Sequence, residues 1–306
     1  MSDNTRGTVE MTAAMMISGT IGVFVVLSGQ PVMDVVFWRC AFGAATLLLV
    51  CGALGLFRRE VISRLQIAYA IIGGIAIVSN WLLLFAAFPR ASISIATAVY
   101  NTQPFMLVAL GALLFRERLT LTKLTWLAIA FAGMLLIVQT KPDAAHTGSN
   151  YLVGILLALG AAFFYAIAAI VAKKLKGVPP HLIALIQVTV GILMLIPFTN
   201  LTNPPTDART WVLLAAVGVI HTGLMYILLY GAIQKLPTNL VGALSFIYPV
   251  VAIIADFVVF GQRLHPLQLV GAIAILVAAA GMTLGWNLIK PRASQSTNRP
   301  ISGRSA

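Results

Sequence analysis

The sequence predicts an all-α polytopic membrane protein with ten transmembrane helices. Of its 306 residues, 60% are hydrophobic and only 9% are charged, whereas a soluble domain carries about 25% charged residues. Apolar runs of about twenty residues recur along the chain, and each is long enough to cross a bilayer as a helix. Membrane β-barrels instead show alternating segments of about ten residues, so we expect a helical bundle embedded in lipid.

Turn-like sequences rich in glycine and proline separate the apolar runs. The first run lacks a clear basic leader and a convincing cleavage site, so it is interpreted as a helix and not as a signal peptide. The polar, basic tail 291–306 is predicted to be disordered. The predicted spans are 9–28, 33–56, 65–88, 91–115, 121–139, 151–174, 180–198, 210–233, 238–260 and 265–288.

The basic residues predict the orientation of the chain. The net charge of +12 comes from short clusters between the spans, a pattern that sets membrane topology and does not suggest a nucleic-acid partner. With the N-terminus inside, the outer loops hold only Arg90, Lys141, Arg209 and Arg263, and Arg39 lies within a span. All other lysines and arginines then fall inside, so the positive-inside rule places both termini in the cytoplasm.

Two segments resemble one another at an offset of 145 residues: TAVYNTQPFMLVALGALLFRERLTLTKL (97–124) and GALSFIYPVVAIIADFVVFGQRLHPLQL (242–269). Five spans per copy is an odd number, so the copies must cross the membrane in opposite directions. We expect two inverted five-helix repeats, 1–145 and 146–290, with a substrate site at their interface near the midplane. The matched pairs are Pro104 with Pro249, Phe115 with Phe260, Arg118 with Arg263, and Leu119 with Leu264.

This repeated pattern of a polar or small stretch, a proline, an apolar run and Phe-x-x-Arg-Leu resembles the drug/metabolite transporter superfamily, and within it the EamA-type exporters. The resemblance covers nearly the whole chain. The segment 115–119 is similar to the family's Gly-Glu-Arg-Leu signature, with Arg116 in place of the glycine, and Gln262 replaces the glutamate in the second copy. General likeness is greatest to bacterial aromatic amino acid exporters, which implies export across the plasma (inner) membrane.

The segment Tyr-Asn-Thr-Gln-Pro (100–104) places polar groups inside one of the most apolar regions of the chain. At about 100° per residue, Tyr100, Asn101, Gln103 and Pro104 share one helical face. Unpaired polar groups in hydrocarbon cost several kcal/mol. This face must therefore look into a cavity or onto partner helices.

Pro104 and its counterpart Pro249 are predicted to kink their helices, since each lacks the N–H that would pair with the carbonyl four residues earlier. The two freed carbonyls belong to Tyr100 and Ser245. They either accept hydrogen bonds from a substrate or are satisfied by water or a side chain, and the sequence leaves both interpretations open.

Other polar and aromatic residues are predicted at a similar depth and form a candidate substrate site. A pocket lined by aromatic rings, with a few amides and hydroxyls, suits a planar amphipathic solute. Lipid-facing or packing roles are the alternative for each aromatic residue. The predicted set comprises Ser18, Thr20, Asn80, Trp81, Tyr100, Asn101, Tyr165, His221, Tyr226, Ser245, Phe246 and Tyr248.

Charged and titratable groups within the spans indicate functional positions. Arg39 is interpreted either as one half of a gate or charge pair with Asp34 or Asp256, or as a direct contact for a substrate carboxylate. His221 is a candidate for proton coupling, with a neutral packing histidine as the alternative. No spacing of cysteine and histidine indicates a metal site, and nothing indicates a cofactor.

These observations predict a secondary transporter that exports small amphipathic metabolites, with aromatic amino acids as the best single choice, by alternating access around a central cavity. The alternatives are a carrier of other metabolites or drugs, or a membrane-embedded enzyme. Catalysis would need a clustered nucleophile, base or metal set, and His221 stands alone. The expected partners are a small-molecule substrate and the bilayer; energy coupling and oligomeric state stay open.

Overall fold

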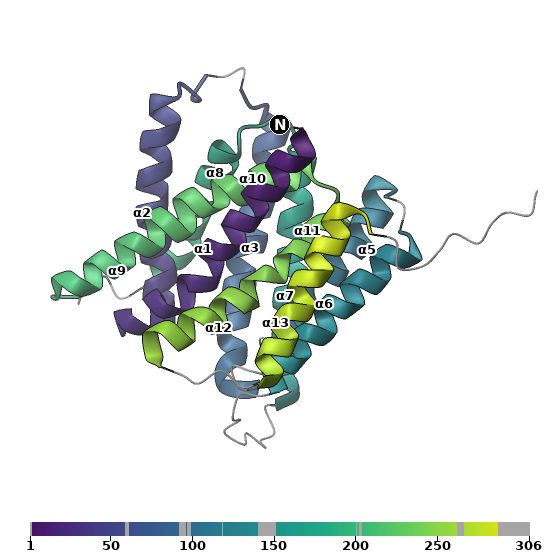
Figure 1. Cartoon of the computed structure of the whole chain (residues 1–306). Helices are drawn as coiled ribbons and strands as arrows, with labels where there is room; N and C mark the ends of the chain where they lie inside the picture. The colour runs from purple at the N-terminus through teal and green to yellow at the C-terminus, as the bar shows by residue number, and fades with distance from the viewer. Residues whose placement is uncertain are drawn as a thin grey trace, which may run out of the picture.

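A computed structural model describes residues 2–58, 61–91, 96, 99–117, 119–139, 151–199, 201, 204–261 and 266–286, and all regular structure in these ranges is helical (Figure 1). The predicted tail 291–306 lies outside the described residues. The first half of the chain forms α1 (Asp3–Ser28), α2 (Val32–Ala53), α3 (Arg64–Ala91), α5 (Gln103–Phe115) and α6 (Leu121–Gln139). The second half forms α7 (Tyr151–Lys174), α8 (Pro180–Leu195), the 3-10 turn η1 (Ile196–Phe198), α9 (Ala208–Gly218), the π-helix η2 (Val219–Leu224), α10 (Met225–Lys235), α11 (Thr238–Ser245), α12 (Ile247–Phe260) and α13 (Pro266–Leu284).

The helix boundaries follow the predicted spans closely in the second half, where α7 covers 151–174 and α11 with α12 covers 238–260. In the first half the differences are larger: α5 begins at Gln103 within the predicted span 91–115, and α1 begins at Asp3 and not at residue 9. The hydroxyl of Ser2 accepts a hydrogen bond from the Thr5 amide at 3.2 Å. This cap satisfies one of the free donors at the helix start, so the helix extends into polar sequence.

Seven helical stretches of the described residues are long and apolar enough to cross a membrane. Three further apolar helices, Gln103–Phe115, Leu121–Leu136 and Leu269–Met282, are shorter. Large apolar side chains such as Leu49, Leu113 and Val258 are exposed on the outside of the bundle. Such a surface is favourable only against lipid or another apolar partner, so the fold is that of a multi-pass membrane protein.

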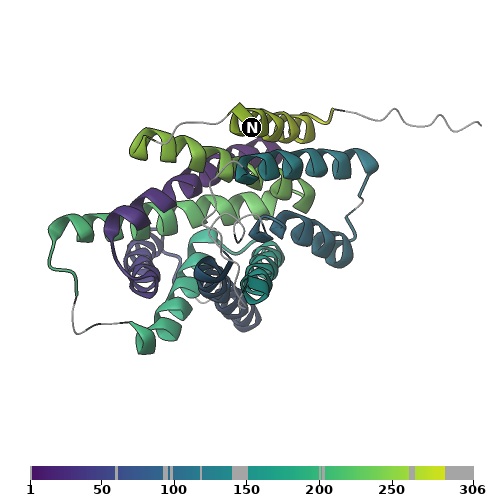
Figure 2. The same ribbon diagram turned by 90° about the horizontal axis from the view of Figure 1, so that it is seen from below.

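Helices far apart in sequence pack in pairs that join the two halves of the chain. α6 packs along α13, α3 along α7, α1 along α10, α2 along α8, and α5 crosses α11. Figures 1 and 2 both show α6 beside the yellow α13. The main core of buried residues draws on helices of both halves, and a second core fills the space between α5, α6, α11 and α13.

The regular helix is interrupted just before each of the two prolines that were predicted to kink their helices, and the interrupting residues Thr102 and Phe246 keep right-handed helical angles. Asn101 and Thr102 form a turn, α5 starts at Gln103, and Pro104 lies in its first turn. In the second half α11 ends at Ser245, and Pro249 lies in the first turn of α12. The first amides of a helix have no helical partner, so each proline falls where its missing N–H removes no helical hydrogen bond.

Close contact between α6 and α13 depends on glycine. A Cβ added at Gly133 would lie 2.7 Å from the carbonyl oxygen of Gly271 and 3.1 Å from the Cβ of Ala274. Backbone atoms cannot give way as a flexible side chain can. Small residues at such crossings let helices approach within van der Waals distance in a bilayer.

We expect Gly133→Ala to destabilise the protein by about 1–3 kcal/mol, because the added methyl group overpacks the α6–α13 contact. The measurement is the midpoint of thermal unfolding of the purified protein in detergent. Gly22→Ala is the matched control, since nothing lies within 4 Å of a Cβ at this exposed helical glycine. That change should be neutral or stabilising, because alanine favours a helix over glycine by about 1 kcal/mol. Equal midpoints for the two variants would contradict this account of the contact.

Candidate functional site

The helix that runs from α9 through η2 to α10 contains a π-helical turn at Val219–Leu224. Within it the hydroxyl of Thr222 donates to the carbonyl of Val217, five residues earlier, at 3.1 Å. Gly218 allows the turn to sit against α2, where a Cβ would meet the Cβ of Phe42 at 2.3 Å. Rare π-turns frequently occur at functional sites, and this one directs the buried side chains of His221 and Thr222 into the bundle.

Arg39 of α2 reaches this turn and is 4% exposed. Its Nε donates to the hydroxyl of Thr222 at 3.2 Å. Its guanidinium carbon lies 4.0 Å from the ring centroid of Trp81 on α3, a cation–π contact. The guanidinium is therefore held between α2, α3 and the π-turn.

Aromatic rings from both halves of the chain continue from Trp81. The rings of Trp81 and Tyr226 meet edge to face at 6.1 Å, and those of Tyr226 and Tyr230 at 5.2 Å. Tyr100 meets Tyr165 of α7 in the same manner at 6.4 Å. Tyr226 is also within electrostatic range of Tyr100 and Tyr165. The two groups of rings together are called here the aromatic cluster: Trp81, Tyr100, Tyr165, Tyr226 and Tyr230.

Part of the aromatic cluster remains accessible although it lies between helices. Tyr165 packs against the main core and has Tyr100 and Ser245 of α11 among its neighbours. Tyr100, Tyr165 and Tyr248 are nevertheless only half-buried. Rings that touch neighbours from both halves and keep accessible surface are suited to contact a solute.

Several buried side-chain amides leave one atom without a hydrogen bond among the described residues. Asn80 is fully buried, and its Nδ2 donates to the carbonyl of Ala161 at 2.7 Å. Its Oδ1 has no hydrogen bond of good geometry to any described residue, although the Tyr100 phenol is its neighbour. Gln103 Oε1 and Gln187 Nε2 also have no hydrogen bond to a described residue. The other amide atom of Gln187, Oε1, accepts a hydrogen bond from the Tyr230 hydroxyl. Buried unsatisfied groups are rare in folded proteins, which makes Asn80 a candidate ligand contact.

His221 and Thr20 lie together on another side of the π-turn. The Nε2 of His221 is 3.0 Å from the Thr20 hydroxyl, which itself donates to the carbonyl of Ile17. The other ring nitrogen is 3.4 Å from the carbonyl of Ala216, and the ring packs against Phe24 at 4.8 Å. This arrangement joins α1 to α9 and gives His221 partners within the protein.

The gate predicted from Arg39, Asp34 and Asp256 stays a prediction. Asp34 lies in the first turn of α2 and has an interaction of its own, Arg39 contacts Thr222 and Trp81, and the side chain of Asp256 lies outside the described residues. Phe246 is buried in the second core against Phe105 and not in the aromatic cluster. Asn101 is buried in the turn before α5.

Sequence analysis missed Thr222, Tyr230 and Gln187. Tyr226 and Tyr230 are four residues apart on α10 and share one face, a signal that was present in the sequence. Thr222 had no such signal, because the π-turn shifts the helical register by one residue and places it beside Arg39.

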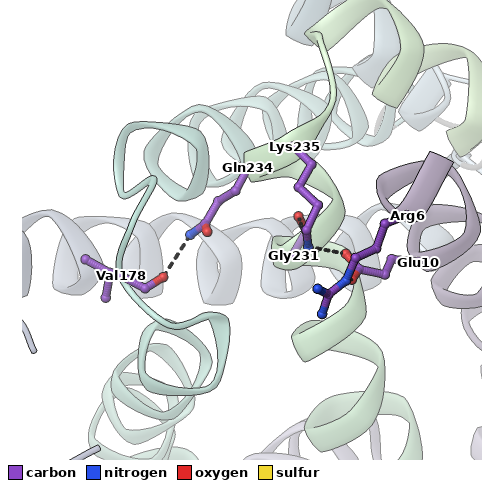
Figure 3. Close-up of polar contacts among 6 residues, drawn as sticks. All are labelled: Arg6, Glu10, Val178, Gly231, Gln234 and Lys235. Atoms are coloured by element: carbon purple, nitrogen blue, oxygen red, sulfur yellow. Dashed lines mark hydrogen bonds and ion pairs between the residues drawn. The ribbon is translucent and has the colours of Figure 1, made fainter. Parts of the chain in front are cut away.

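Ion pairs between oppositely charged side chains lie near the N-terminal end of α1. Lys235 of α10 pairs with Glu10 of α1 at 2.6 Å, and Arg6 pairs with the other oxygen of Glu10 at 3.0 Å. Gln234 donates to the carbonyls of Leu175 and Val178 at 3.1 Å each. Figure 3 shows that these contacts link α1 and α10 to the turn after α7.

A third ion pair joins the turn after α5 to α7, and its carboxylate also binds α11. Glu117 binds the ammonium of Lys173 at 2.5 Å and accepts hydrogen bonds from the Thr238 amide and hydroxyl at 2.9 and 2.5 Å. Lys173 also donates to the carbonyl of Leu236. Partial burial raises the pKa of Glu117, but the bonds from Lys173 and Thr238 outweigh it and hold the pKa below its ordinary value.

We expect Glu117→Gln to lower the free energy of unfolding at neutral pH by about 1–3 kcal/mol, the range for a hydrogen bond to a charged group. Because the pKa of Glu117 is depressed in the folded protein, its contribution is present above the ordinary carboxyl pKa and is lost as pH falls through the depressed value. The gap between wild type and variant should therefore close on acidification.

The measurement is the thermal unfolding midpoint of both proteins in detergent from pH 7 to well below about pH 4. Asp3→Asn is the control, because Asp3 is an exposed carboxylate outside both ion pairs. A gap that stays constant with pH would show that the charge of Glu117 contributes nothing.

Comparison with known proteins gives a consistent family match. The profile of the "EamA-like transporter family" matches residues 6–139 and again residues 152–284. A protein of Bacillus subtilis (strain 168) described as "Uncharacterized transporter YxxF" is 30% identical over 280 residues, 90% of this chain and 88% of that protein.

Two further relatives are described by what they export. A "Probable amino-acid metabolite efflux pump" of Salmonella typhimurium is 28% identical over 60% of this chain and 64% of its own length. The "Threonine/homoserine exporter RhtA" of Escherichia coli (strain K12) is 26% identical over 66% of both chains. The match thus spans just under two thirds of each of these relatives.

A solved structure described as "Crystal structure of protein" superposes with a TM-score of 0.80 over 92% of this chain and 97% of that chain. The two sequences are 19% identical, so the likeness concerns the fold.

Proposed function

The chain belongs to the EamA-like transporter family, and from this premise we propose that it is a secondary transporter that exports small amphipathic metabolites, with aromatic amino acids as the preferred class. The observation that carries the proposal is the aromatic cluster. In it, Trp81 and Tyr100 from the first half meet Tyr226 and Tyr165 from the second. Such rings stack on an aromatic solute, each contributing about 0.5–1.5 kcal/mol beyond burial.

We propose ten membrane spans in two inverted halves, 1–145 and 146–290. The family profile matches the chain twice, and an odd number of spans per half inverts the second copy. The packing supports a two-fold relation between the halves. In three contacts a helix packs against its own counterpart in the other half: α6 with α13, α2 with α8, and α5 with α11. The contact of α3 with α7 is repeated by their counterparts, α10 and α1. In such transporters the substrate site lies between the repeats near the midplane.

Alternating access requires one end of the bundle to close while the other opens. The ion pairs Glu10–Lys235 and Glu117–Lys173 join four or more helices at one end. The positive-inside rule assigns this end, with both termini, to the cytoplasm of the plasma (inner) membrane. We propose that these pairs hold the cytoplasmic side closed and must break when substrate enters from the cell.

The class of substrate is argued from two sources. The relatives described as amino-acid metabolite and threonine/homoserine exporters support an amino acid or a similar metabolite. The ring-rich composition of the cluster supports an aromatic side chain over a small polar one. A carrier of other metabolites or drugs is the first alternative. A membrane-embedded enzyme is the second, and recovery of a chemically altered solute after transport would reveal it.

We expect Tyr100→Ala, Trp81→Ala or Tyr165→Ala to raise the KM for an aromatic amino acid by about 10-fold, because each removes a stacking surface. The measurement is efflux of labelled phenylalanine from proteoliposomes, with threonine as a second substrate. The matched control is Phe163→Ala on the same helix as Tyr165, since Phe163 is 46% exposed on the outside of the bundle. Normal flux in all three site variants would mean that the site lies elsewhere.

His221 tests energy coupling separately. We expect His221→Gln, which keeps a group able to bond Thr20 but does not titrate, to leave the ratio of efflux with and without a proton gradient unchanged. The reason is that both ring nitrogens already lie near partners in the protein. If the proton gradient no longer changed efflux in the variant, measured in the same vesicles, His221 would instead lie on a proton pathway.

A further inference from the structure

The buried guanidinium of Arg39 lacks a negative partner among the described side chains. Thr222, which accepts the bond from Nε, is neutral, and the ring of Trp81 offers only its π-face. Among the described groups that its charge influences are His221, Cys40, Tyr226 and Tyr230, none of which is an acid that ionises readily at neutral pH.

A buried positive charge with this environment is unusual. Charged side chains inside proteins are almost always paired, because the cost of leaving water exceeds what a neutral hydrogen bond and a cation–π contact return. Arg39 makes no hydrogen bond to a described residue other than the one to Thr222. Its terminal nitrogens are the fork that binds a carboxylate through two parallel bonds.

A hydrogen-bond acceptor that could complement Arg39 lies on Asn80, the residue before Trp81 on α3. Asn80 Oδ1 is buried without a good partner among the described residues, and it is adjacent in sequence to Trp81, which holds the guanidinium. Tyr226 lies near both Arg39 and Trp81, and Tyr100 lies near Tyr226 and Asn80. Arg39 and Asn80 are thus connected through the rings of Trp81, Tyr226 and Tyr100.

We propose that Arg39 binds the carboxylate of the transported solute, while Trp81 orients the guanidinium and Asn80 Oδ1 accepts a hydrogen bond from the solute's ammonium group. The substrate class is then an α-amino acid with an apolar or aromatic side chain. This inference rests on the proposed function, since it concerns the same site. It separates zwitterionic amino acids from aromatic amines and neutral drugs of similar shape.

The test pairs each variant with each part of the substrate. Proteoliposomes carrying the full chain are assayed for efflux of labelled L-phenylalanine, and for competition by phenethylamine, which lacks the carboxylate, and 3-phenylpropionate, which lacks the ammonium. We expect wild type to bind phenethylamine about 10- to 100-fold more weakly than phenylalanine, the factor for a lost hydrogen-bonded charge.

Arg39→Gln should weaken phenylalanine binding by a similar factor and leave phenethylamine unchanged, so the discrimination disappears. Arg39→Lys keeps the positive charge but loses the paired nitrogens of the guanidinium, so it should retain part of the discrimination between phenylalanine and phenethylamine. Asn80→Leu should weaken phenylalanine and phenethylamine but not 3-phenylpropionate. Because Arg39→Gln can also affect folding, the increase in thermal midpoint on adding each compound in detergent is measured for every variant.

Three results overturn the inference. Equal loss for phenylalanine and phenethylamine in Arg39→Gln would assign Arg39 a structural role and leave the proposed function intact. An equal loss of phenylalanine and phenethylamine binding in Asp256→Asn, restored in the double variant of Arg39→Gln with Asp256→Asn, would show that Asp256 is the partner of Arg39. Wild-type vesicles that move none of the amino acids tested would refute the proposed function itself, and this inference with it.

Discussion

The arrangement of this bundle depends on one constraint: a polar group carried into the bilayer must find its partner inside the protein, because lipid offers none. The main-chain groups are satisfied by helices. The side chains of Asn80, Thr20 and His221 each reach a partner on another helix. Those bonds join α3 to α7 and α1 to η2. Where the constraint is not fully met, at Arg39 and at Asn80 Oδ1, the protein keeps unused bonding capacity in its interior. A structural site would be expected to satisfy these groups, whereas a binding site must leave capacity for its ligand.

The same constraint separates two kinds of polar contact along the bundle. Full ion pairs, Glu10 with Lys235 and Glu117 with Lys173, gather at one end, where water can solvate the charges whenever a pair breaks. The described interior holds neutral amides, hydroxyls and phenols, together with a single arginine that Trp81 covers. Ion pairs near water are weak enough to open and close, and this suits a gate. Neutral groups in the interior can meet a solute without the large desolvation cost that several buried charges would impose.

Much of the fold could be read from the sequence, because hydropathy and turn residues determine where a helix can enter and leave the bilayer. The spans 121–139 and 151–174 coincide with α6 and α7. Pro104 and Pro249 were predicted as kinks, and the regular helix is interrupted just before each proline. Two features were beyond this approach. The N-terminal extension of α1 depends on the cap by Ser2. Thr222 was missed because a helical wheel of about 100° per residue does not apply across a π-turn, and only the three-dimensional structure shows that this turn faces Arg39.

The position of Arg39 also bears on how binding would be linked to movement. Arg39 and Trp81 belong to the first half of the chain, whereas Thr222 belongs to the second. A motion of one half against the other would keep the cation–π contact within the first half and stretch the bond from Arg39 to Thr222. The guanidinium would then lose its only hydrogen bond to a described residue while remaining buried. A carboxylate bound at the terminal nitrogens supplies the missing acceptor in that arrangement. A ligand shifts a conformational equilibrium only by the difference in its affinity for the two states. If Arg39 binds the solute's carboxylate as proposed, the solute would stabilise most the state in which Thr222 no longer reaches Arg39.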